Sequence, residues 1–418
     1  MKEKALLVGL NLKNSDYDID YYLDELKSLA QANDIEVCER IYQTLEKPNN
    51  KTYVGQGKLE EIKIIIQSMD ITLVIFDDEL TPSQMRNIED ILECKIIDRS
   101  MLILDIFAKR AKTKQAVIEV KMAQLRYLLP RLNEVTQSLS RQGGSSFNAK
   151  GPGEKQIDLD RRRILKQLEL LKKESLKQNS QKEIENKKRL NSNIPIVALV
   201  GYTNAGKSST MNKIISEYGF SNDKNVYAKD MLFATLEASS RYIKLDNNQE
   251  FILMDTVGFV SKLPHHLVGS FYQTLATVKY ADILIHVLDA SSPYLERQML
   301  VTNTVLKSLD IMPKKTLYLL NKCDMITETV YFKEHNSLFY SNKTGHNFDE
   351  LINFIKKSIK NKTIICELNI PYTDGKSANF VEEKAIIMQK LFHSTGTYYK
   401  IEIEKRYFHH INQYIEKS

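Results

Sequence analysis

A glycine-rich stretch ending in lysine and serine carries the clearest chemical signal in the sequence. Residues 201–208 fit the pattern G-x-x-x-x-G-K-[ST]. The apolar run 194–200 before them predicts a buried strand, and residues 209–215 predict the start of a helix. A strand, a glycine loop and a helix N-terminus place backbone N–H groups around a polyphosphate. The residues expected to hold nucleotide here are Gly201, Tyr202, Thr203, Asn204, Ala205, Gly206, Lys207, Ser208 and Ser209.

Within this phosphate loop, two side chains have distinct expected roles. Lys207 would reach the outer phosphates, and the Ser208 hydroxyl would ligate Mg²⁺. A second motif, Asp255, Thr256, Val257 and Gly258, follows a predicted buried strand at 251–254. There Asp255 would hold the magnesium through water, and the Gly258 N–H would meet the γ-phosphate. Together these residues predict binding of a nucleoside triphosphate with Mg²⁺.

A third motif indicates which base is bound. Asn321, Lys322, Cys323 and Asp324 follow a predicted strand at 316–320. The Asp324 carboxylate can accept from the N1 and N2 hydrogens of guanine, whereas adenine offers a different donor pattern. Asn321 would brace the loops, and the Lys322 stem would lie over the base. The three motifs in this order therefore favour GTP.

The elements that position these motifs predict an α/β protein. Strand and helix patterns alternate over residues 194–360, with strands at 194–200, 251–254, 283–288 and 316–320, as in a doubly wound, mostly parallel sheet. Residues 1–110 also alternate, with strands at 5–10, 36–43, 71–76 and 95–98. The glycines near residues 54–58 lack phosphate-loop spacing and predict a turn entering a helix. We expect an N-terminal α/β subdomain at 1–110, a helical hairpin at 111–193, a P-loop GTPase domain at 194–360 and a small α/β C-terminal domain at 361–418.

The predicted hairpin has a basic, glycine-rich tip. Residues 100–132 predict one or two helices with a break near 111–113 and an end at Pro130 and Arg131. A glycine-rich loop is expected at 134–157, and a second helix at 158–190. Two helices joined by such a loop indicate an antiparallel arm that reaches a target. A disordered linker is the alternative.

Positive charge is concentrated in this hairpin. Residues 109–163 hold thirteen Lys or Arg and five Asp or Glu, a net of +8 in a chain whose total is +6. Clustered cations are what phosphate neutralisation requires, so we expect a local RNA contact; a solvated helical face is the alternative. The candidate contact residues are Arg126, Arg131, Arg141, Lys150, Lys155, Arg161, Arg162 and Arg163.

Composition excludes several other classes of protein. The four cysteines lie far apart with no C-x-x-C pair, which argues against a disulfide framework or zinc site. The N-terminus has no signal-peptide apolar region, and no apolar run approaches the length that spans a bilayer. We expect a cytoplasmic monomer without stable membrane insertion, and leave partial association with membranes open.

Several stretches resemble the HflX family, within the Obg-HflX group of translation-factor-related GTPases. In addition to the three motifs, residues 232–236 (LFATL), 255–260 (DTVGFV) and 263–268 (LPHHLV) are similar to that family. Upstream, residues 102–108, 123–127, 130–132, 151–154 and 160–163 resemble its N-terminal domain. The resemblance covers about residues 1–360.

The resemblance implies a GTPase that binds the large ribosomal subunit near the peptidyl-transferase region, splits stalled or idle ribosomes and is activated by the ribosome. It implies that Thr235, beside Phe233 and Ala234, senses the γ-phosphate and completes magnesium coordination. Lys207, Thr235 and Gly258 would then be the catalytic residues. Ser341, Asn342 and Lys343 fall where the last base-contacting loop begins, with Asn342 in place of the usual alanine.

One residue affects the expected rate of hydrolysis. Phe259 follows Gly258, where other GTPases have a glutamine that orients the attacking water. We therefore expect slow intrinsic hydrolysis that the ribosome accelerates. Two alternatives stay open: a GTPase of large-subunit assembly, and an RNA-binding regulatory switch in which GTP only gates a partner.

Overall fold

The computed structural model describes residues 2–13, 18–142, 152–191, 194–219, 239–246, 249–263, 277–311, 314–326, 332–359 and 363–415. The chain divides into two compact units. The first comprises Met1–Lys182, Asp230–Glu237 and Val260–Gln273, and the second comprises Glu183–Lys229, Ala238–Phe259 and Thr274–Ser418. Each unit has its own sheet and hydrophobic core.

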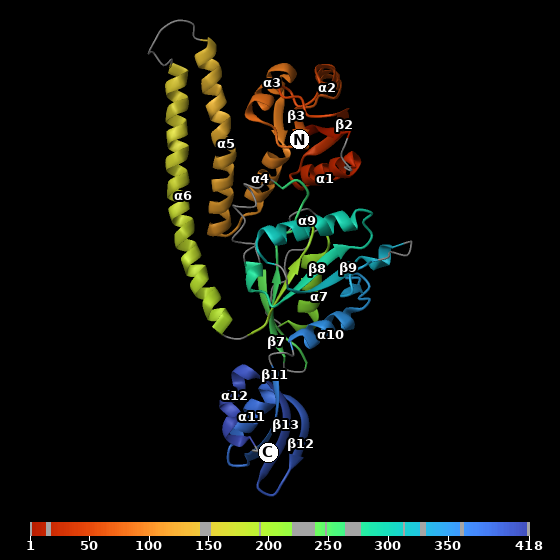
Figure 1. The fold of residues 1–418 in the computed structure, drawn as a ribbon, viewed down its shortest axis with the longest axis vertical. Helices are drawn as coiled ribbons and strands as arrows, with labels where there is room; N and C mark the ends of the chain where they lie inside the picture. The colour runs from red at the N-terminus through yellow and green to blue at the C-terminus, as the bar shows by residue number, and fades with distance from the viewer. Residues whose placement is uncertain are drawn as a thin grey trace. The chain divides into compact units, whose positions relative to one another are not determined.

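A four-stranded parallel sheet forms the start of the first unit (Figure 1). Its order is β2-β1-β3-β4, and parallel neighbours require crossover helices. A capping box between Thr81 and Gln84, with Pro82 at the first helical turn, starts the third helix. The strands and helices are β1 (Lys4–Leu12), α1 (Ile19–Ala32), β2 (Glu36–Leu45), α2 (Gln56–Met69), β3 (Leu73–Phe76), α3 (Pro82–Leu92) and β4 (Lys95–Asp98). The expected α/β architecture is confirmed.

Three helices follow this sheet: α4 (Arg99–Arg110), α5 (Lys114–Gln142) and α6 (Pro152–Asn191). The break between α4 and α5 lies where the sequence predicts it. Lys114 of α5 and Glu174 of α6 form an ion pair with 2.6 Å between Nζ and Oε1. Because Lys114 begins α5 and Glu174 lies in the C-terminal half of α6, the two helices run antiparallel, as Figure 1 shows.

Two predicted boundaries of this hairpin are wrong. α5 does not end at Pro130 but continues to Gln142. A proline removes one intrahelical hydrogen bond, and the adjoining turn is held here by Arg131, which donates to Tyr127 O at 2.8 Å and Leu80 O at 3.0 Å. α6 begins at Pro152 rather than residue 158, because proline suits the first turn of a helix. Both ends of the expected loop at 134–157 are therefore helical, and residues 143–151 lie outside the described residues.

A buried cluster of charges joins residues 261 and 262 to the first unit. The Arg99 guanidinium, 1% exposed, donates to Asp77 Oδ1 at 2.6 Å, Glu25 Oε2 at 2.7 Å and Ser261 O at 3.1 Å. Lys262 pairs with Asp77 as well. Burial acts to raise the pKa of Asp77, but the two cations outweigh burial and hold that pKa below its ordinary value.

The second unit contains a six-stranded sheet in the order β10-β9-β8-β5-β7-β6. All its pairs are parallel except β6 with β7 at the edge. Helices α7, α9 and α10 accompany the sheet (Figure 1). The elements are β5 (Ile196–Val200), α7 (Lys207–Tyr218), β6 (Ser239–Lys244), β7 (Glu250–Asp255), β8 (Ile283–Asp289), α9 (Leu295–Ser308), β9 (Lys315–Asn321), β10 (Ser337–Phe339) and α10 (Phe348–Ile359). The predicted doubly wound, mostly parallel sheet is confirmed, and β6 is a strand that the sequence pattern did not indicate.

The end of the chain folds as a small α/β layer. Its antiparallel sheet has the order β11-β13-β12, and Leu368, Val381, Tyr399 and Ile401 contribute to its own core. The elements are β11 (Thr363–Pro371), α11 (Gly375–Lys384), β12 (Ile386–Phe392), β13 (Gly396–Glu404) and α12 (Phe408–Ile411). Across the described ranges of both units, no helix is long and apolar enough to cross a membrane.

Candidate nucleotide-binding site

The phosphate loop joins the buried strand β5 to α7. Gly206 forms the N-cap of α7 with φ +101°, a left-handed conformation that favours glycine. A Cβ at Gly206 would lie 2.1 Å from Asn321 Nδ2, so no larger residue fits. No side chain caps α7. Its first backbone N–H groups and the positive end of its dipole therefore suit an anion.

Lys207 is folded back over the loop that contains it. Its ammonium donates to Gly201 O at 3.0 Å and Tyr202 O at 2.6 Å, and the residue is 6% exposed. Burial lowers the pKa of Lys207 to about 8, although the nearby Asp255 carboxylate acts in the opposite direction. The two carbonyl groups are neutral acceptors, so a phosphate group here would supply the negative charge that the Lys207 ammonium lacks.

The second motif follows β7 and meets the phosphate loop. Ser208 Oγ donates to Asp255 Oδ2 at 2.7 Å, and Asp255 is fully buried. Thr256 Oγ1 donates to Leu199 O at 2.8 Å, which fixes the turn against β5. A Cβ on Gly258 would lie 2.9 Å from Lys207 Nζ. The structure thus places Asp255, Gly258, Lys207 and Ser208 together.

Phe259 follows this motif just beyond the end of β7. It forms a parallel bridge with Tyr202, its carbonyl accepts from Thr203 N at 2.8 Å, and its N–H donates to Gly201 O at 3.2 Å. The residue is 2% exposed. A buried phenyl ring cannot hydrogen-bond to water, so this position offers no side chain to orient a nucleophile.

The third motif follows β9 at the same edge of the sheet. Asn321 Nδ2 donates to Ala205 O at 2.8 Å, which braces the phosphate loop as expected. Lys322 lies in the left-handed region, with φ 63°, and pairs with Asp289 at 2.7 Å. Ser341 Oγ donates to Asp324 Oδ1 at 2.6 Å. That hydrogen bond is the main cause that lowers the pKa of the exposed Asp324 carboxyl, which keeps it ionised as an acceptor.

The remaining expected site residues are distributed unevenly. Asn342 contacts the phosphate loop through Gly206, and Lys343 is exposed beside it. Phe233, Ala234, Thr235 and Lys150 lie outside the described residues. On the hairpin, Arg126 and Arg161, Arg162 and Arg163 are exposed, while Arg141 and Lys155 lie on α5 and α6. Arg131 is instead engaged with Asp98 at 3.1 Å, and its guanidinium stacks on the Tyr127 ring.

Sequence reasoning missed three residues at the base end of the site. Asp289, the partner of Lys322, ends β8, so its place after a third parallel strand was an available signal. Thr210 and Tyr340 also hydrogen-bond with Asn342. The Thr210 contact joins segments 132 positions apart, which no local pattern indicates, whereas Tyr340 lies two positions before Asn342 in the same loop.

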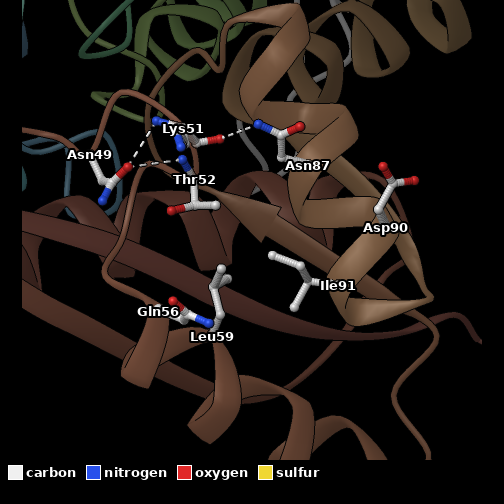
Figure 2. A pocket seen from close by; sticks show the side chains of 8 residues that line it. All are labelled: Asn49, Lys51, Thr52, Gln56, Leu59, Asn87, Asp90 and Ile91. Carbon is white, nitrogen blue, oxygen red and sulfur yellow. Dashed lines mark hydrogen bonds between the residues drawn. The ribbon is translucent and has the colours of Figure 1, made fainter. Parts of the chain in front are cut away.

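A separate pocket of about 620 Å³ lies in the first unit, at the turn that enters α2. Figure 2 shows that its polar groups bond to one another: Asn49 Oδ1 accepts from Lys51 N at 2.8 Å, and Asn87 Nδ2 donates to Lys51 O at 2.9 Å. The turn enters a helix as expected from residues 54–58. These internal hydrogen bonds account for the loop geometry without a ligand.

Three family descriptions match successive parts of the chain. Residues 20–108 match "GTP-binding GTPase N-terminal", residues 110–189 match "GTP-binding GTPase Middle Region", and residues 196–322 match "50S ribosome-binding GTPase". Together they span most of residues 20–322, which include the hairpin and the phosphate-loop and D-x-x-G motifs.

Curated relatives match over nearly the whole length. GTPase HflX of Lacrimispora saccharolytica is 36% identical over 98% of this chain and 95% of its own. GTPase HflX of Caldanaerobacter subterraneus is 37% identical over 96% of this chain and 91% of its own. That of Escherichia coli (strain K12) is 35% identical over 92% and 89%. A GDP-bound GTP-binding protein from Sulfolobus solfataricus aligns with a TM-score of 0.44 and 23% identity, covering 86% of this chain and 99% of that chain.

A doubly wound sheet whose strand ends carry the phosphate loop, D-x-x-G and N-K-x-D motifs defines a P-loop GTPase. The protein binds GTP and hydrolyses it. The extent and identity of the curated matches go further: the chain belongs to the HflX family of GTPases.

Proposed function

We propose that this GTPase binds the large ribosomal subunit and splits stalled or idle ribosomes, and that the ribosome stimulates its GTP hydrolysis. The observation that carries the proposal is a long, cation-bearing helical pair in a chain that also contains a GTPase domain. The description "50S ribosome-binding GTPase" for the family matching residues 196–322 supports the same partner.

The α5–α6 pair has the dimensions and charge of an arm that contacts RNA. With 29 and 40 residues, these helices are about 43 and 60 Å long at roughly 1.5 Å per residue. Arg126 and Arg161 to Arg163 are exposed, and exposed clustered cations displace counterions from RNA phosphates. We propose that they contact ribosomal RNA near the peptidyl-transferase region together with Arg141, Lys150 and Lys155. Arg131 is left out, because it is used within the first unit.

At the nucleotide, we assign roles by position. Lys207 stabilises charge on the outer phosphates, and the Gly258 N–H donates to the γ-phosphate, with Thr235 as the residue that senses it. Asp324, ionised and oriented by Ser341, accepts from the guanine N1 and N2 hydrogens. Lys322, held by Asp289, covers the base.

The residues present also fit Mg²⁺. Ser208 and the fully buried Asp255 place a hydroxyl and a carboxylate oxygen 2.7 Å apart beside the phosphate loop, and Mg²⁺ prefers oxygen ligands shared with phosphates. We propose that Ser208 ligates the ion, Asp255 holds it through water and Thr235 completes the set. When bound, Mg²⁺ neutralises charge on the transferring phosphoryl group.

Slow intrinsic hydrolysis follows from the environment of Phe259. Its buried ring leaves the attacking water without a side chain to orient it. Lys207 and the backbone donors stabilise charge, and we propose that the ribosome supplies the missing order around the water. A basal rate equal to the ribosome-stimulated rate would contradict this.

We further propose a cytoplasmic, monomeric protein.

Sedimentation of intact ribosomes in sucrose gradients tests the function. The protein is added with GTP, a non-hydrolysable GTP analogue or GDP, and Lys207→Ala serves as the nucleotide-site control. Accumulation of subunits with the triphosphates, and not with GDP or the variant, supports splitting. Persistence of intact ribosomes without co-sedimentation of the protein overturns the ribosome assignment.

A pair of charge variants tests the arm separately. Arg161, Arg162 and Arg163 are changed together to Glu, and the matched control changes the exposed Lys27, Lys47 and Lys51 to Glu, outside the α5–α6 pair. Only the arm variant should bind ribosomes more weakly. The affinity that remains in that variant should depend less steeply on salt concentration than the affinity of the wild type. Binding restricted to precursor subunits would instead favour the assembly role. Binding of RNA without GTP turnover would favour the regulatory switch.

A further inference from the structure

Asn342 occupies a position where its side chain reaches two parts of the nucleotide site. It follows Tyr340 and Ser341 in the loop after β10. Its Nδ2 donates to Thr210 Oγ1 at 3.1 Å and to Gly206 O at 3.3 Å. Its backbone N–H donates to Asn321 Oδ1 at 3.2 Å. One residue thus contacts the phosphate loop, the first turn of α7 and the end of β9.

The hydrogen bonds fix the direction of the amide. The Tyr340 hydroxyl donates to Asn342 Oδ1 at 2.9 Å, so the amide nitrogen faces Thr210 and Gly206. The Thr210 hydroxyl in turn donates a hydrogen bond to Gly206 O, with 2.9 Å between the oxygens. We name these four residues, Tyr340, Asn342, Thr210 and Gly206, the Asn342 bridge. Each side chain in it has its donors and acceptors matched to the next.

The bridge lies in a tightly packed part of the site. Tyr340 and Thr210 are fully buried, and a Cβ on Gly206 would lie 3.2 Å from Asn342 Nδ2. An alanine at position 342 would keep the backbone bond to Asn321 but lose all three side-chain hydrogen bonds. The base-recognition loop would then keep its link to the phosphate loop through Asn321, whose Nδ2 donates to Ala205 O, but would lose the link through Gly206.

We propose that Asn342 is a positioning residue that couples the guanine end of the site to its phosphate end and slows release of bound guanine nucleotide. The proposal rests on the placement of guanine beside Asp324. Ser341, which orients Asp324, immediately precedes Asn342, so movement of this loop displaces the base acceptor. The bridge hydrogen-bonds the same loop to Gly206 of the phosphate loop. The contacts to the guanine base and the contacts to the phosphates should therefore break together. Nucleotide departure therefore requires breaking both sets at once.

Dissociation of fluorescent GDP, chased with unlabelled GDP, measures this coupling directly. Asn342→Ala should release GDP about three- to tenfold faster than the wild type, since water replaces part of the lost hydrogen bonding at this half-buried position. Asn342→Asp keeps the side-chain volume but turns an acceptor toward Gly206 O, so it should release GDP at least as fast. Tyr340→Phe, which removes only the orienting hydroxyl, should have a smaller effect of the same sign.

Two further measurements separate positioning from general damage. Single-turnover cleavage of prebound GTP in Asn342→Ala should fall by a smaller factor than the factor by which GDP release rises, because Asn342 bonds to the backbone of the phosphate loop at Gly206 rather than to the reacting phosphate. The double variant Tyr340→Phe with Asn342→Ala should release GDP no faster than Asn342→Ala alone, because the two residues act through one bridge.

The outcomes are distinct. An unchanged GDP release rate in both Asn342 variants overturns the proposal, and so does an additive double variant. A loss of single-turnover cleavage as large as the gain in GDP release, or larger, also overturns it, because the main role of Asn342 would then be to hold the phosphate loop for catalysis. If the wild-type protein itself releases GDP instantly and Lys207→Ala behaves identically, the nucleotide site as a whole is misplaced. That result overturns the proposed function along with the bridge.

Discussion

Ser208 Oγ and Asp255 Oδ2 are hydrogen-bonded over 2.7 Å although they lie 47 positions apart in the chain. The contact joins the start of α7 to the end of β7, and it brings a hydroxyl and a buried carboxylate to one point beside the phosphate loop. Two neighbouring parallel strands, β5 and β7, produce this meeting because their carboxyl ends share one edge of the sheet.

This pair predicts how the enzyme depends on magnesium. Ser208→Ala should raise the Mg²⁺ concentration for half-maximal hydrolysis about tenfold or more, because an oxygen ligand is lost. The affinity for fluorescent GTP, measured across a magnesium titration, should show the same shift. In EDTA, the affinities of Ser208→Ala and the wild type should differ less. Ser216→Ala, an exposed serine further along α7, is the matched control. An unchanged magnesium requirement in Ser208→Ala would show that the serine is no ligand.

Lys207 predicts a pH dependence of triphosphate binding. Burial lowers its pKa to about 8 in the free protein, and bound phosphates should raise that pKa again. Above pH 8 the free lysine is mostly neutral and must gain a proton on binding, so affinity should fall as the pH rises through 8. Binding should take up about 0.1 proton at pH 7.0 and about 0.75 at pH 8.5, given a pKa of about 8.

Calorimetry in buffers of different ionisation enthalpy measures this uptake. Lys207→Arg provides the control, because arginine stays protonated throughout this range. Equal proton uptake at both pH values in the wild type would mean that Lys207 is already fully charged in the free protein.

His286 predicts a loss of stability in mild acid. It lies on β8, is 1% exposed, and its Nε2 has no hydrogen-bond partner among the described residues. Burial, and then the charge of Lys207, lowers its pKa to about 3. The unfolded chain binds a proton from about pH 6.5 downward while the folded protein does not, so this group destabilises the fold progressively between pH 6.5 and 3 and has no effect above 6.5.

The chain has eight histidines, and a comparison with His286→Gln isolates the effect of His286 on the pH dependence of stability from that of the others. Urea unfolding at pH 7.0, 6.0 and 5.0 should give a wild-type free energy that falls faster than that of the variant, by up to about 1.4 kcal/mol per pH unit. Parallel curves for the two proteins would exclude His286 as the cause.

Arg99 predicts a large effect on the stability of the first unit. Arg99→Met leaves Asp77 and Glu25 buried without their cation, so the free energy of unfolding should fall by about 3–5 kcal/mol. Arg40→Met removes an exposed pair with Asp24 and should cost less than about 1 kcal/mol. Urea unfolding monitored by circular dichroism compares the two. Similar losses in both variants would contradict a special role for the buried cluster.

Asp324 predicts the base preference. Asp324→Asn replaces an acceptor of the guanine N1 and N2 hydrogens with an amide that can donate to the O2 of xanthine. Competition between fluorescent GDP and unlabelled GDP or xanthosine diphosphate should shift toward xanthine by about a hundredfold or more. Glu350→Gln, an exposed acidic residue on α10, is the control. Retained guanine preference in Asp324→Asn would place the base elsewhere.

Much of the fold follows from local patterns. The strand before the phosphate loop and the break between α4 and α5 were both predictable, because burial of short apolar runs and the interruption of a helical pattern depend on neighbouring residues. The course of the chain at Pro130 was not, because Arg131 holds that turn through Leu80 and Asp98, which come from other elements. The edge strand β6 was missed because its residues lack a strong apolar alternation.

The sequence by itself determined which groups follow the buried strands: a phosphate loop, and two acidic residues for which we propose contacts with magnesium and with guanine. Only the tertiary structure decided how these residues are connected. It bridged Phe259 to Tyr202 of the phosphate loop, paired Lys322 with Asp289, and turned the Asn342 amide toward Gly206. The physical reason is range. Spacing and polarity specify helices, strands and loops, whereas hydrogen bonds between loops depend on which strand ends the folded sheet brings together.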